Sequence, residues 1–265
     1  MKNIKDVELF VFDLDGTVYI GDEEIEGSFA AINELRKRGK RVCFFTNNSS
    51  RMHTDYIARL NKLGLRTYSD EIYTSGQVTC EYILDNYRGA KVYLLGNERL
   101  KSEFALYGIE TVEDDPDICV IGFDTSLSYD RLYKFCSYVN KGLPYIATHP
   151  DYFCPAPGCP MPDVGAMIEA VRLTVGRTPD LVMGKPHKTA GERLAKKYNL
   201  PARKIAMVGD RLYTDVAFGK NCGFVSVLVL SGETDAQMLS ASKIKPDYVL
   251  GFVKDIIPIL DDNSI

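Results

Sequence analysis

An apolar run that ends in two carboxylates is the feature that most constrains this chain. Residues 9–12 read Leu-Phe-Val-Phe, and Asp13, Asp15 and Gly16 follow at once. Continuous apolar runs are typical of buried parallel strands, and ligands of open α/β sheets lie beyond the carboxyl ends of such strands. The run therefore predicts a ligand site at Asp13 and Asp15.

This pair of carboxylates favours a definite chemistry. Asp13 and Asp15 would repel each other unless a cation neutralised them, and Mg²⁺ prefers such oxygen ligands. A carboxylate near a hard cation can attack phosphorus as a nucleophile, and a second carboxyl can act as general acid on the leaving oxygen. The alternative is a solvated turn in which the Asp-x-Asp spacing has no function.

The composition argues against several classes of protein. The 265 residues are 45% hydrophobic, which suits one large or two ordinary folded domains. With 32 Lys and Arg against 36 Asp and Glu, the net charge of -4 argues against a nucleic-acid or anionic-membrane surface. No apolar stretch approaches the roughly 20 residues of a membrane span, and no signal-peptide region follows the start, so we expect a cytoplasmic protein.

The cysteines point to the same compartment. There are seven, an odd number, and most lie inside apolar runs, which favours reduced thiols over a disulfide framework. Cys154 and Cys159 are the exception, because they lie near His149 in the sequence. A zinc site there is an alternative, although the spacing is irregular and no fourth ligand is evident.

Strand-like runs alternate with helical stretches along the chain, which is typical of an α/β fold. The predicted strands are 9–12, 41–45, 72–75, 92–96, 118–122, 145–148, 181–186, 205–210, 225–230 and 248–250. The predicted helices are 28–38, 54–63, 77–86, 98–107, 129–140, 164–174, 189–198 and 252–260. Between 148 and 163, a proline-rich stretch predicts a stiff loop that either lines a substrate pocket or only connects elements on the surface.

Four predicted strands end in polar residues with complementary chemistry. If these strands share one parallel sheet, their ends meet at one edge. They then supply what phosphoryl transfer needs, namely oxygen ligands for a cation, a positive point charge and hydroxyl donors. The polar residues are Asp13 with Asp15, Thr46 with Asn47, Lys185, and Asp210 with Asp215.

Each of these residues also has a purely structural interpretation. Lys185 could be a solvated surface lysine, Thr46 could cap a strand end, and Asp215 could be a helix N-cap. His187 is a candidate base, but the carboxyl pair leaves it no necessary role. The joint appearance of these residues in this order is what favours the catalytic interpretation.

The same residues resemble the four motifs of the haloacid dehalogenase (HAD) superfamily of phosphohydrolases. These are Asp-Leu-Asp-Gly-Thr at 13–17, Phe-Thr-Asn-Asn at 45–48, Gly-Lys-Pro at 184–186 and Gly-Asp-Arg-Leu-Tyr-Thr-Asp at 209–215. The Thr-Asn-Asn form, with a large insertion after it, is similar to the NagD-like and 4-nitrophenylphosphatase-like branch, subfamily IIA. The resemblance implies a Rossmann-like three-layer core with a parallel sheet at 1–78 and 184–265, and an inserted α/β cap domain at 79–183.

The resemblance also implies a role for each motif residue. Asp13 is the nucleophile that becomes a phosphoaspartate, and Asp15 protonates the leaving alcohol and later activates water. Lys185 steadies both Asp13 and the phosphoryl group. The implied substrate-binding residues are Thr46, Asn47, Asn48 and Lys185. The implied Mg²⁺ ligands are the Asp13 carboxylate, the Asp15 carbonyl oxygen and Asp210, with Asp215 just behind them.

The implied function is a Mg²⁺-dependent phosphatase of small phosphate monoesters, such as sugar phosphates, nucleoside monophosphates, glycerol-type phosphates and 4-nitrophenyl phosphate. Residues 149–165 of the cap are the candidates for recognising the leaving group. Two alternatives stay open, a phosphomutase and a non-catalytic protein that binds phosphate esters as a regulator. The expected partner is a small phosphorylated metabolite rather than nucleic acid or membrane, and both a monomer and a homodimer are compatible with the sequence.

Overall fold

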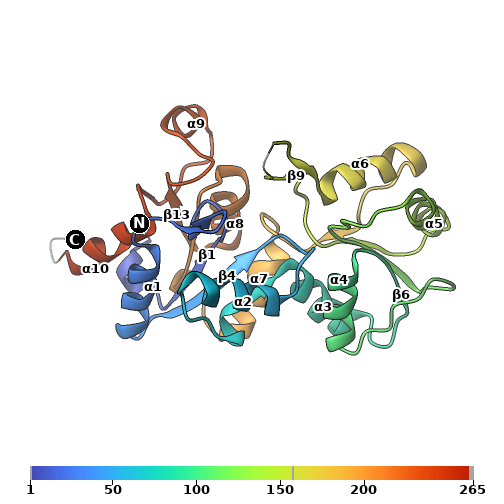
Figure 1. Ribbon diagram of the computed structural model, residues 1–265, viewed down its shortest axis with the longest axis horizontal. Coiled ribbons are helices and arrows are strands. Elements are labelled where there is room, and N and C mark those ends of the chain that lie inside the picture. The colour runs from blue at the N-terminus through green and yellow to red at the C-terminus, as the bar shows by residue number, and fades with distance from the viewer. Residues whose placement is uncertain (1, 157, 263–265) are drawn as a thin grey trace. The chain divides into compact units, whose positions relative to one another are not determined.

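The computed structural model describes residues 2–156 and 158–262 (Figure 1). By their internal packing these residues form two compact units, which we describe separately. The first unit comprises 2–45, 57–73 and 185–262, and the second comprises 46–56 and 74–184. Each unit is an α/β structure built around its own sheet, as the alternation of strands and helices predicted.

A six-stranded sheet forms the centre of the first unit. From edge to edge its strands are β14 (Tyr248–Leu250), β13 (Val225–Val229), β12 (Ile205–Gly209), β1 (Leu9–Phe12), β4 (Arg41–Thr46) and β5 (Ile72–Thr74). The pairs from β14 to β4 are parallel, and all residues of β1, β12 and β13 are buried, as expected for continuous apolar runs.

The strand order reverses at the pair of β1 and β12. The chain runs outward from β1 through β4 to β5, and later runs outward the other way from β12 through β13 to β14. Phe12 is in register with Val208, so these two strands end at the same level. Ligands of open α/β sheets bind beyond the strand ends at such a reversal, which identifies the residues after β1 and β12 as the place to look for a site.

Helices cover both faces of this sheet. In Figure 1, α1 and α8 lie on opposite sides of β1, and α1 packs against α10 while α7 packs against α8. The helices of this unit are α1 (Ser28–Lys37), α2 (His53–Leu63) from residue 57 on, α7 (Lys188–Tyr198), α8 (Ala217–Cys222), α9 (Ala236–Ala241) and α10 (Ile256–Asp261). A short antiparallel ribbon of β2 (Tyr19–Ile20) and β3 (Glu23–Glu24) follows β1. The shorter turns are the 3₁₀ segments Ile4–Asp6, Ser69–Glu71, Ala202–Lys204 and Val253–Asp255 and the π-helical turn Leu212–Val216.

The second unit has a parallel four-stranded sheet between two helix layers. Its strands are β11 (Leu181–Val182), β8 (Tyr145–Ala147), β7 (Ile118–Ile121) and β6 (Val92–Leu95), in that order. The helices are α3 (Ser75–Asn86), α4 (Glu98–Leu106), α5 (Tyr129–Asn140) and α6 (Val164–Val175). Figure 1 shows α5 and α6 on one side of β6 and α3 and α4 on the other.

The structure corrects two of the sequence-based expectations about strands. The strand before Lys185 is only Leu181–Val182, and it pairs with β8 of the second unit, so the four polar strand ends do not share one sheet. The proline-rich loop also contains an antiparallel ribbon, β9 (Phe153–Cys154) with β10 (Met161–Pro162). The prolines do not prevent this pairing because a two-stranded ribbon consists only of edges.

Two of the predicted helices begin two or more residues away from their predicted start. Helix α3 starts at Ser75, inside the predicted strand, because Thr74 and Gln77 exchange the two bonds of a capping box. The predicted helix 252–260 is a 3₁₀ turn followed by α10 from Ile256.

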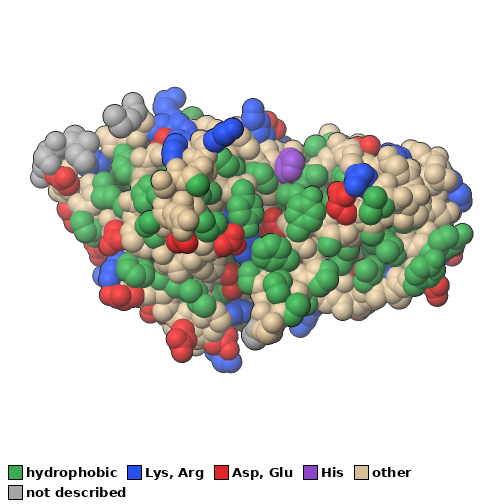
Figure 2. Space-filling model, turned by 90° about the horizontal axis from the view of Figure 1, so that it is seen from above, with side chains coloured by type: hydrophobic (Ala, Val, Ile, Leu, Met, Phe, Trp, Pro, Cys, Tyr) green, Lys and Arg blue, Asp and Glu red, His purple; other side chains and the backbone are tan. Residues whose placement is uncertain are grey.

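The surface carries charges of both signs. On the face drawn in Figure 2, basic, acidic and hydrophobic side chains are intermixed, as the nearly balanced charge of the sequence leads us to expect. Among the described helices, none combines the length and the apolar character needed to cross a membrane.

Candidate active site

The site of the first unit is organised around a buried ammonium group. Lys185 is only 1% exposed, and its Nζ lies 2.6 Å from Asp13 Oδ1 and 2.8 Å from Asp215 Oδ1. The same Nζ donates to the Phe45 carbonyl at 3.1 Å. Burial alone would lower the pKa of Lys185, but the two carboxylates raise it above its ordinary value. The lysine is therefore charged and holds Asp13 in place, and its interpretation as a surface lysine is wrong.

Three carboxylates converge beside this lysine. Oxygens of Asp13, Asp210 and Asp215 all lie within 4.8 Å of one another. Burial, with the nearby charge of Asp13, raises the pKa of Asp210 to about 7. Burial also raises the pKa of Asp215 to about 6, although Lys185 opposes that change. The cluster therefore holds more negative charge than Lys185 alone balances, which is the environment that a hard cation stabilises.

Both oxygens of Asp215 are occupied. Oδ1 binds Lys185, and Oδ2 accepts the backbone N–H of Arg211 at 3.1 Å. Asp215 lies within the π-helical turn Leu212–Val216, whose N-cap position is Arg211, so the N-cap interpretation of Asp215 is wrong. Of the three carboxylates Asp13 is the most accessible, because Asp210 and Asp215 are buried while Asp13 is partly exposed.

Asp210 occupies a space that only glycines leave open. A Cβ on Gly232 would lie 2.1 Å from Asp210 Oδ2, and a Cβ on Gly16 would lie 2.5 Å from it. The Glu233 N–H donates to the same oxygen at 2.7 Å, and the Ser231 hydroxyl donates to the Gly16 carbonyl at 2.8 Å. Residues 231–233 were not predicted as part of the site. Their place in the sequence was a possible signal, because residues 231–233 follow a buried strand, as Asp13 does, and residues at that end of a parallel strand lie near the ligand site.

Asp15 is placed where a substrate can reach it. Its side chain is exposed, and one oxygen accepts the Tyr19 hydroxyl at 3.4 Å. Tyr19 is itself fully buried, with the Arg59 guanidinium 4.6 Å from its ring centre. Thr17, from the same motif, is buried and donates to Asp210 Oδ1 at 3.4 Å. Asp15 is thus an accessible carboxyl on an ordered turn.

The second motif lies in the second unit. Thr46 and Asn47 are buried, and the Thr46 hydroxyl accepts the N–H of Asn48 at 3.1 Å, which is the local role of a strand-end cap. The Asn47 amide donates to both oxygens of Asp151, at 3.2 and 3.1 Å. The Asn48 side chain accepts the N–H and the hydroxyl of Ser50, at 2.9 and 2.7 Å. These bonds restrict the conformation of residues 46–48.

The remaining candidates carry no chemistry of their own in this arrangement. His187 is an exposed residue at the start of α7. None of the seven cysteines, all of which the structure describes, forms a disulfide, and Cys154 is half-buried while Cys159 is exposed. Among the residues that the structure describes, the clusters with metal-binding geometry are Asp13 with Asp210 and Asp215, and His149 with Asp151 and Asp163, and neither includes a cysteine.

Comparison with known proteins agrees with this geometry. Residues 10–110 match the family described as haloacid dehalogenase-like hydrolase, and 182–256 match a second, HAD-hydrolase-like family. Phosphoglycolate phosphatase 1A of Arabidopsis thaliana is 33% identical over 281 aligned residues, which cover 96% of this chain and 77% of the relative.

Solved structures with the same fold extend over nearly the whole chain. The crystal structure of 4-nitrophenylphosphatase from Thermotoga maritima is 42% identical, with a TM-score of 0.94 over 96% of this chain and 98% of that one. A glycerol phosphate phosphatase from Mycobacterium tuberculosis, solved in complex with magnesium, is 28% identical, with a TM-score of 0.88 over 97% of this chain and 78% of that one. The chain therefore belongs to the haloacid dehalogenase-like hydrolases, in the branch of NagD and 4-nitrophenylphosphatase, and is a phosphoric monoester hydrolase.

Proposed function

We propose that this chain is a Mg²⁺-dependent phosphatase that hydrolyses small phosphate monoesters through a phosphoaspartate on Asp13. The observation that carries the proposal is the contact of Lys185 with Asp13, at 2.6 Å, beside the carboxylate of Asp210. Phosphoryl transfer depends chiefly on positioning and on stabilising negative charge. A nucleophile held by a buried ammonium next to hard oxygen ligands suits both needs.

The acidic cluster fits a hard divalent cation. Its oxygens lie within 4.8 Å of one another, and burial together with the neighbouring carboxylates raises the pKa of Asp210 to about 7. We assign the metal to Asp13, Asp210 and the carbonyl oxygen of Asp15, with Asp215 behind them. When bound, Mg²⁺ would neutralise charge on the transferring phosphoryl group. The magnesium bound to the Mycobacterium tuberculosis relative supports this choice of metal.

Two displacements follow from the roles of Asp13 and Asp15. In the first, an Asp13 oxygen bonds to phosphorus, the ester P–O bond breaks, and the Asp15 carboxyl gives its proton to the leaving alcohol. In the second, the Asp15 carboxylate takes a proton from water, whose oxygen bonds to phosphorus while the bond to Asp13 breaks. Free phosphate leaves, and both carboxyls regain their starting forms. Lys185 holds the Asp13 oxygen in place during both displacements.

The substrate end of the proposal concerns residues 46–48 and the inserted domain. Thr46, Asn47 and Asn48, with Lys185, would bind the phosphoryl group. We keep the division into a core of 1–78 and 184–265 and a cap of 79–183, which would exclude large substrates. Relatives named for phosphoglycolate, 4-nitrophenyl phosphate and glycerol phosphate support small esters as the substrate class.

The proposed setting is the cytoplasm, where the seven cysteines, which form no disulfide among the described residues and four of which are buried, would stay reduced. The proposed partner is a small phosphorylated metabolite, with no nucleic acid or membrane involved. Monomer and homodimer are both compatible with this function.

The test is phosphate release from a panel of small esters, with Mg²⁺ and with chelator. Wild type is compared with Asp13→Asn and with Asp22→Asn, a control at a carboxylate that is 87% exposed. We expect Mg²⁺-dependent release that Asp13→Asn lowers by about 10⁵-fold, equivalent to roughly 7 kcal/mol of transition-state stabilisation, while the control is unchanged. An isomerised sugar phosphate in place of free phosphate would make the protein a mutase. A bound ester that is never cleaved would make it a regulator.

A further inference from the structure

The side chain of Asn47 is held by a carboxylate that the steps above do not use. Its Nδ2 donates to both oxygens of Asp151, at 3.2 and 3.1 Å, and both residues belong to the second unit. The Asn47 carbonyl accepts the hydroxyl of Ser75, and the residue is only 5% exposed. With its side chain and its carbonyl both bonded, Asn47 has little freedom to turn.

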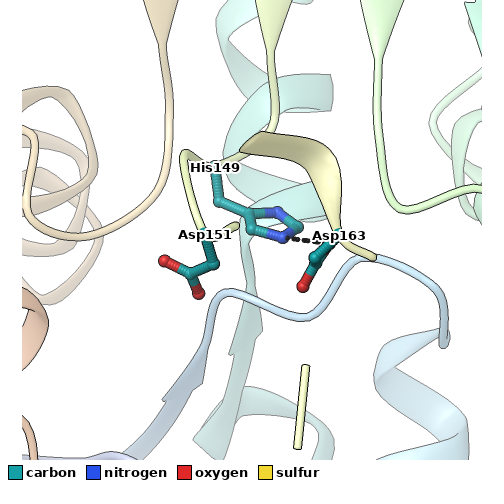
Figure 3. Close-up of side chains that lie close together, drawn as sticks. All are labelled: His149, Asp151 and Asp163. Carbon is teal, nitrogen blue, oxygen red and sulfur yellow. Dashed lines mark hydrogen bonds and ion pairs between the residues drawn. The ribbon is translucent and has the colours of Figure 1, made fainter. Parts of the chain in front are cut away.

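A buried histidine–aspartate pair lies beside Asp151, with ligand atoms of His149, Asp151 and Asp163 within 4.8 Å of one another. His149 is fully buried, its Nε2 lies 2.9 Å from Asp163 Oδ1, and its Nδ1 lies 3.0 Å from Thr148 Oγ1 (Figure 3). The Asp151 carbonyl accepts the N–H of Gly165 at 2.7 Å, near the start of α6. Figure 3 shows the His149 ring between the carboxyl groups of Asp151 and Asp163. The turn at 149–151 is therefore bonded at both ends.

A second connection ties the same two segments together. The hydroxyl of Ser49 lies 3.0 Å from that of Thr148, and its oxygen accepts the N–H of Phe123 at 2.9 Å. Ser49 and Thr148 are both fully buried. The loop after β4 is thus joined to the segment after β8 at two points, Asn47 with Asp151 and Ser49 with Thr148.

We propose that Asp151 is a positioning residue for phosphate binding. It holds Asn47 so that the loop 46–48 presents its donors to the phosphoryl group, and the bond from the Gly165 N–H to the Asp151 carbonyl holds Asp151 itself. The proposal rests on the function proposed above. A carboxylate near a phosphate site repels the phosphate and weakens its binding. The two hydrogen bonds that Asp151 accepts from Asn47 give this carboxylate another role, which is to hold the Asn47 side chain.

A metal site at this cluster is the competing interpretation. Ligand atoms of His149, Asp151 and Asp163 lie within 4.8 Å of one another. Both imidazole nitrogens, however, already have protein partners, and both Asp151 oxygens accept from Asn47. A metal would have to replace these bonds, so the geometry favours the positioning role.

The experiment compares Asp151→Ala with wild type on several esters and measures competitive inhibition by inorganic phosphate. We expect Asp151→Ala to weaken phosphate inhibition and to lower kcat/KM by about 10- to 100-fold, as for a lost hydrogen bond to a charged group. The factor should be the same for every ester. Asp151→Asn keeps one acceptor for the Asn47 amide and should recover part of the loss. Asp130→Ala, an exposed carboxylate of the same unit, is the matched control.

A double-mutant cycle separates positioning from other roles. If Asp151 acts through Asn47, the double variant of Asp151→Ala with Asn47→Ala should lose no more of kcat/KM than the more damaging of the two single variants. Additive losses, an unchanged phosphate inhibition constant, or a loss confined to some leaving groups would overturn the proposal. So would stoichiometric Zn²⁺ binding by wild type that Asp163→Asn abolishes. Thermal unfolding checks that each variant is folded, and Asp151→Asn carries the test if Asp151→Ala is not. If the wild type releases no phosphate from any ester, that result contradicts the proposed function.

Discussion

Lys185 Nζ lies 2.6 Å from Asp13 Oδ1, although 172 positions separate the two residues and the strand before Lys185 belongs to a different sheet from β1. The ammonium is buried and also bonds to Asp215 at 2.8 Å. The positive charge of Lys185 is balanced by these two carboxylates. The lysine therefore fixes the position of Asp13 and reduces the repulsion between Asp13 and Asp215.

Replacing this lysine should damage both activity and stability. Lys185→Met leaves Asp13 and Asp215 without their shared cation. We expect kcat/KM to fall by about 10³-fold and the free energy of unfolding to fall by roughly 3 kcal/mol. Phosphate release and urea unfolding measure the two effects. Lys188→Met, at an exposed lysine of α7, should change neither. Activity within threefold of wild type would contradict the role given to Lys185.

Replacing Asp210 should change the Mg²⁺ requirement of the reaction without lowering the stability of the fold. Asp210→Asn should raise the Mg²⁺ concentration for half-maximal phosphate release by at least about 10-fold, because a charged ligand is lost. In chelator the same change should leave the free energy of unfolding unchanged or higher, since it relieves repulsion among three close carboxylates. Asp114→Asn, at a side chain that is 86% exposed, is the control. An unchanged Mg²⁺ requirement would remove Asp210 from the metal ligands.

Gly232 should tolerate no side chain. In Gly232→Ala the added Cβ would lie 2.1 Å from Asp210 Oδ2, so either the carboxylate or the loop must move. We expect at least a 10-fold loss of kcat/KM and a loss of about 1–3 kcal/mol in the free energy of unfolding. Gly251→Ala meets only the tip of Asp255, at 3.2 Å, and should change kcat/KM less than twofold. Equal effects of the two variants would mean that the contact with Asp210 has no consequence.

Asp247 should make the free energy of unfolding depend on pH in the acid range. Its carboxylate accepts the N–H and the hydroxyl of Ser226, each at 2.9 Å, and bonds to Lys220. Partial burial would raise the pKa of Asp247, but these bonds lower it below its ordinary value. The stabilisation is therefore present above the unfolded-state pKa of about 4 and is lost as the pH falls through the lower folded-state pKa.

The variant Asp247→Asn tests this. At pH 7 we expect its free energy of unfolding to be about 1–2 kcal/mol below that of wild type. The difference should shrink as the pH falls below about 4, because protonation removes the same charge from wild type. Urea unfolding at a series of pH values measures it. A difference that stays constant down to acid pH would show that the charge of Asp247 contributes nothing.

The central sheet and half of the site could be predicted because their causes are local. The run Leu9–Phe12 and the run Ile205–Gly209 are apolar enough to be buried on both faces, and an aspartate directly follows each of them. Parallel neighbours end at the same edge, so Asp13 and Asp210 meet once β1 and β12 pair. The apolar pattern and the polar strand ends indicated which strands carry Asp13 and Asp210, while the pairing of β1 with β12 itself comes from the structure.

The rest depends on contacts that no local pattern specifies. Lys185 reaches Asp13 from a segment whose strand pairs elsewhere, so the reasoning from a shared sheet was wrong even though the two residues meet. The bond from Asn47 to Asp151 joins positions 104 apart, and the sequence alone gives no reason to pair them. Gly232 was missed although it follows the buried strand Val225–Val229, because nothing in one sequence marks a loop glycine as one needed for close approach.

The place of β1 in the middle of its sheet affects how the chain can fold as it is made. Leu9 pairs with Arg41 on one side and with Ile205 on the other. At a translation rate of about 5–20 residues per second, β12 is synthesised on the order of 10–40 seconds after β1. During that time one long edge of an entirely apolar strand has no neighbour, and the nascent chain is most exposed to aggregation.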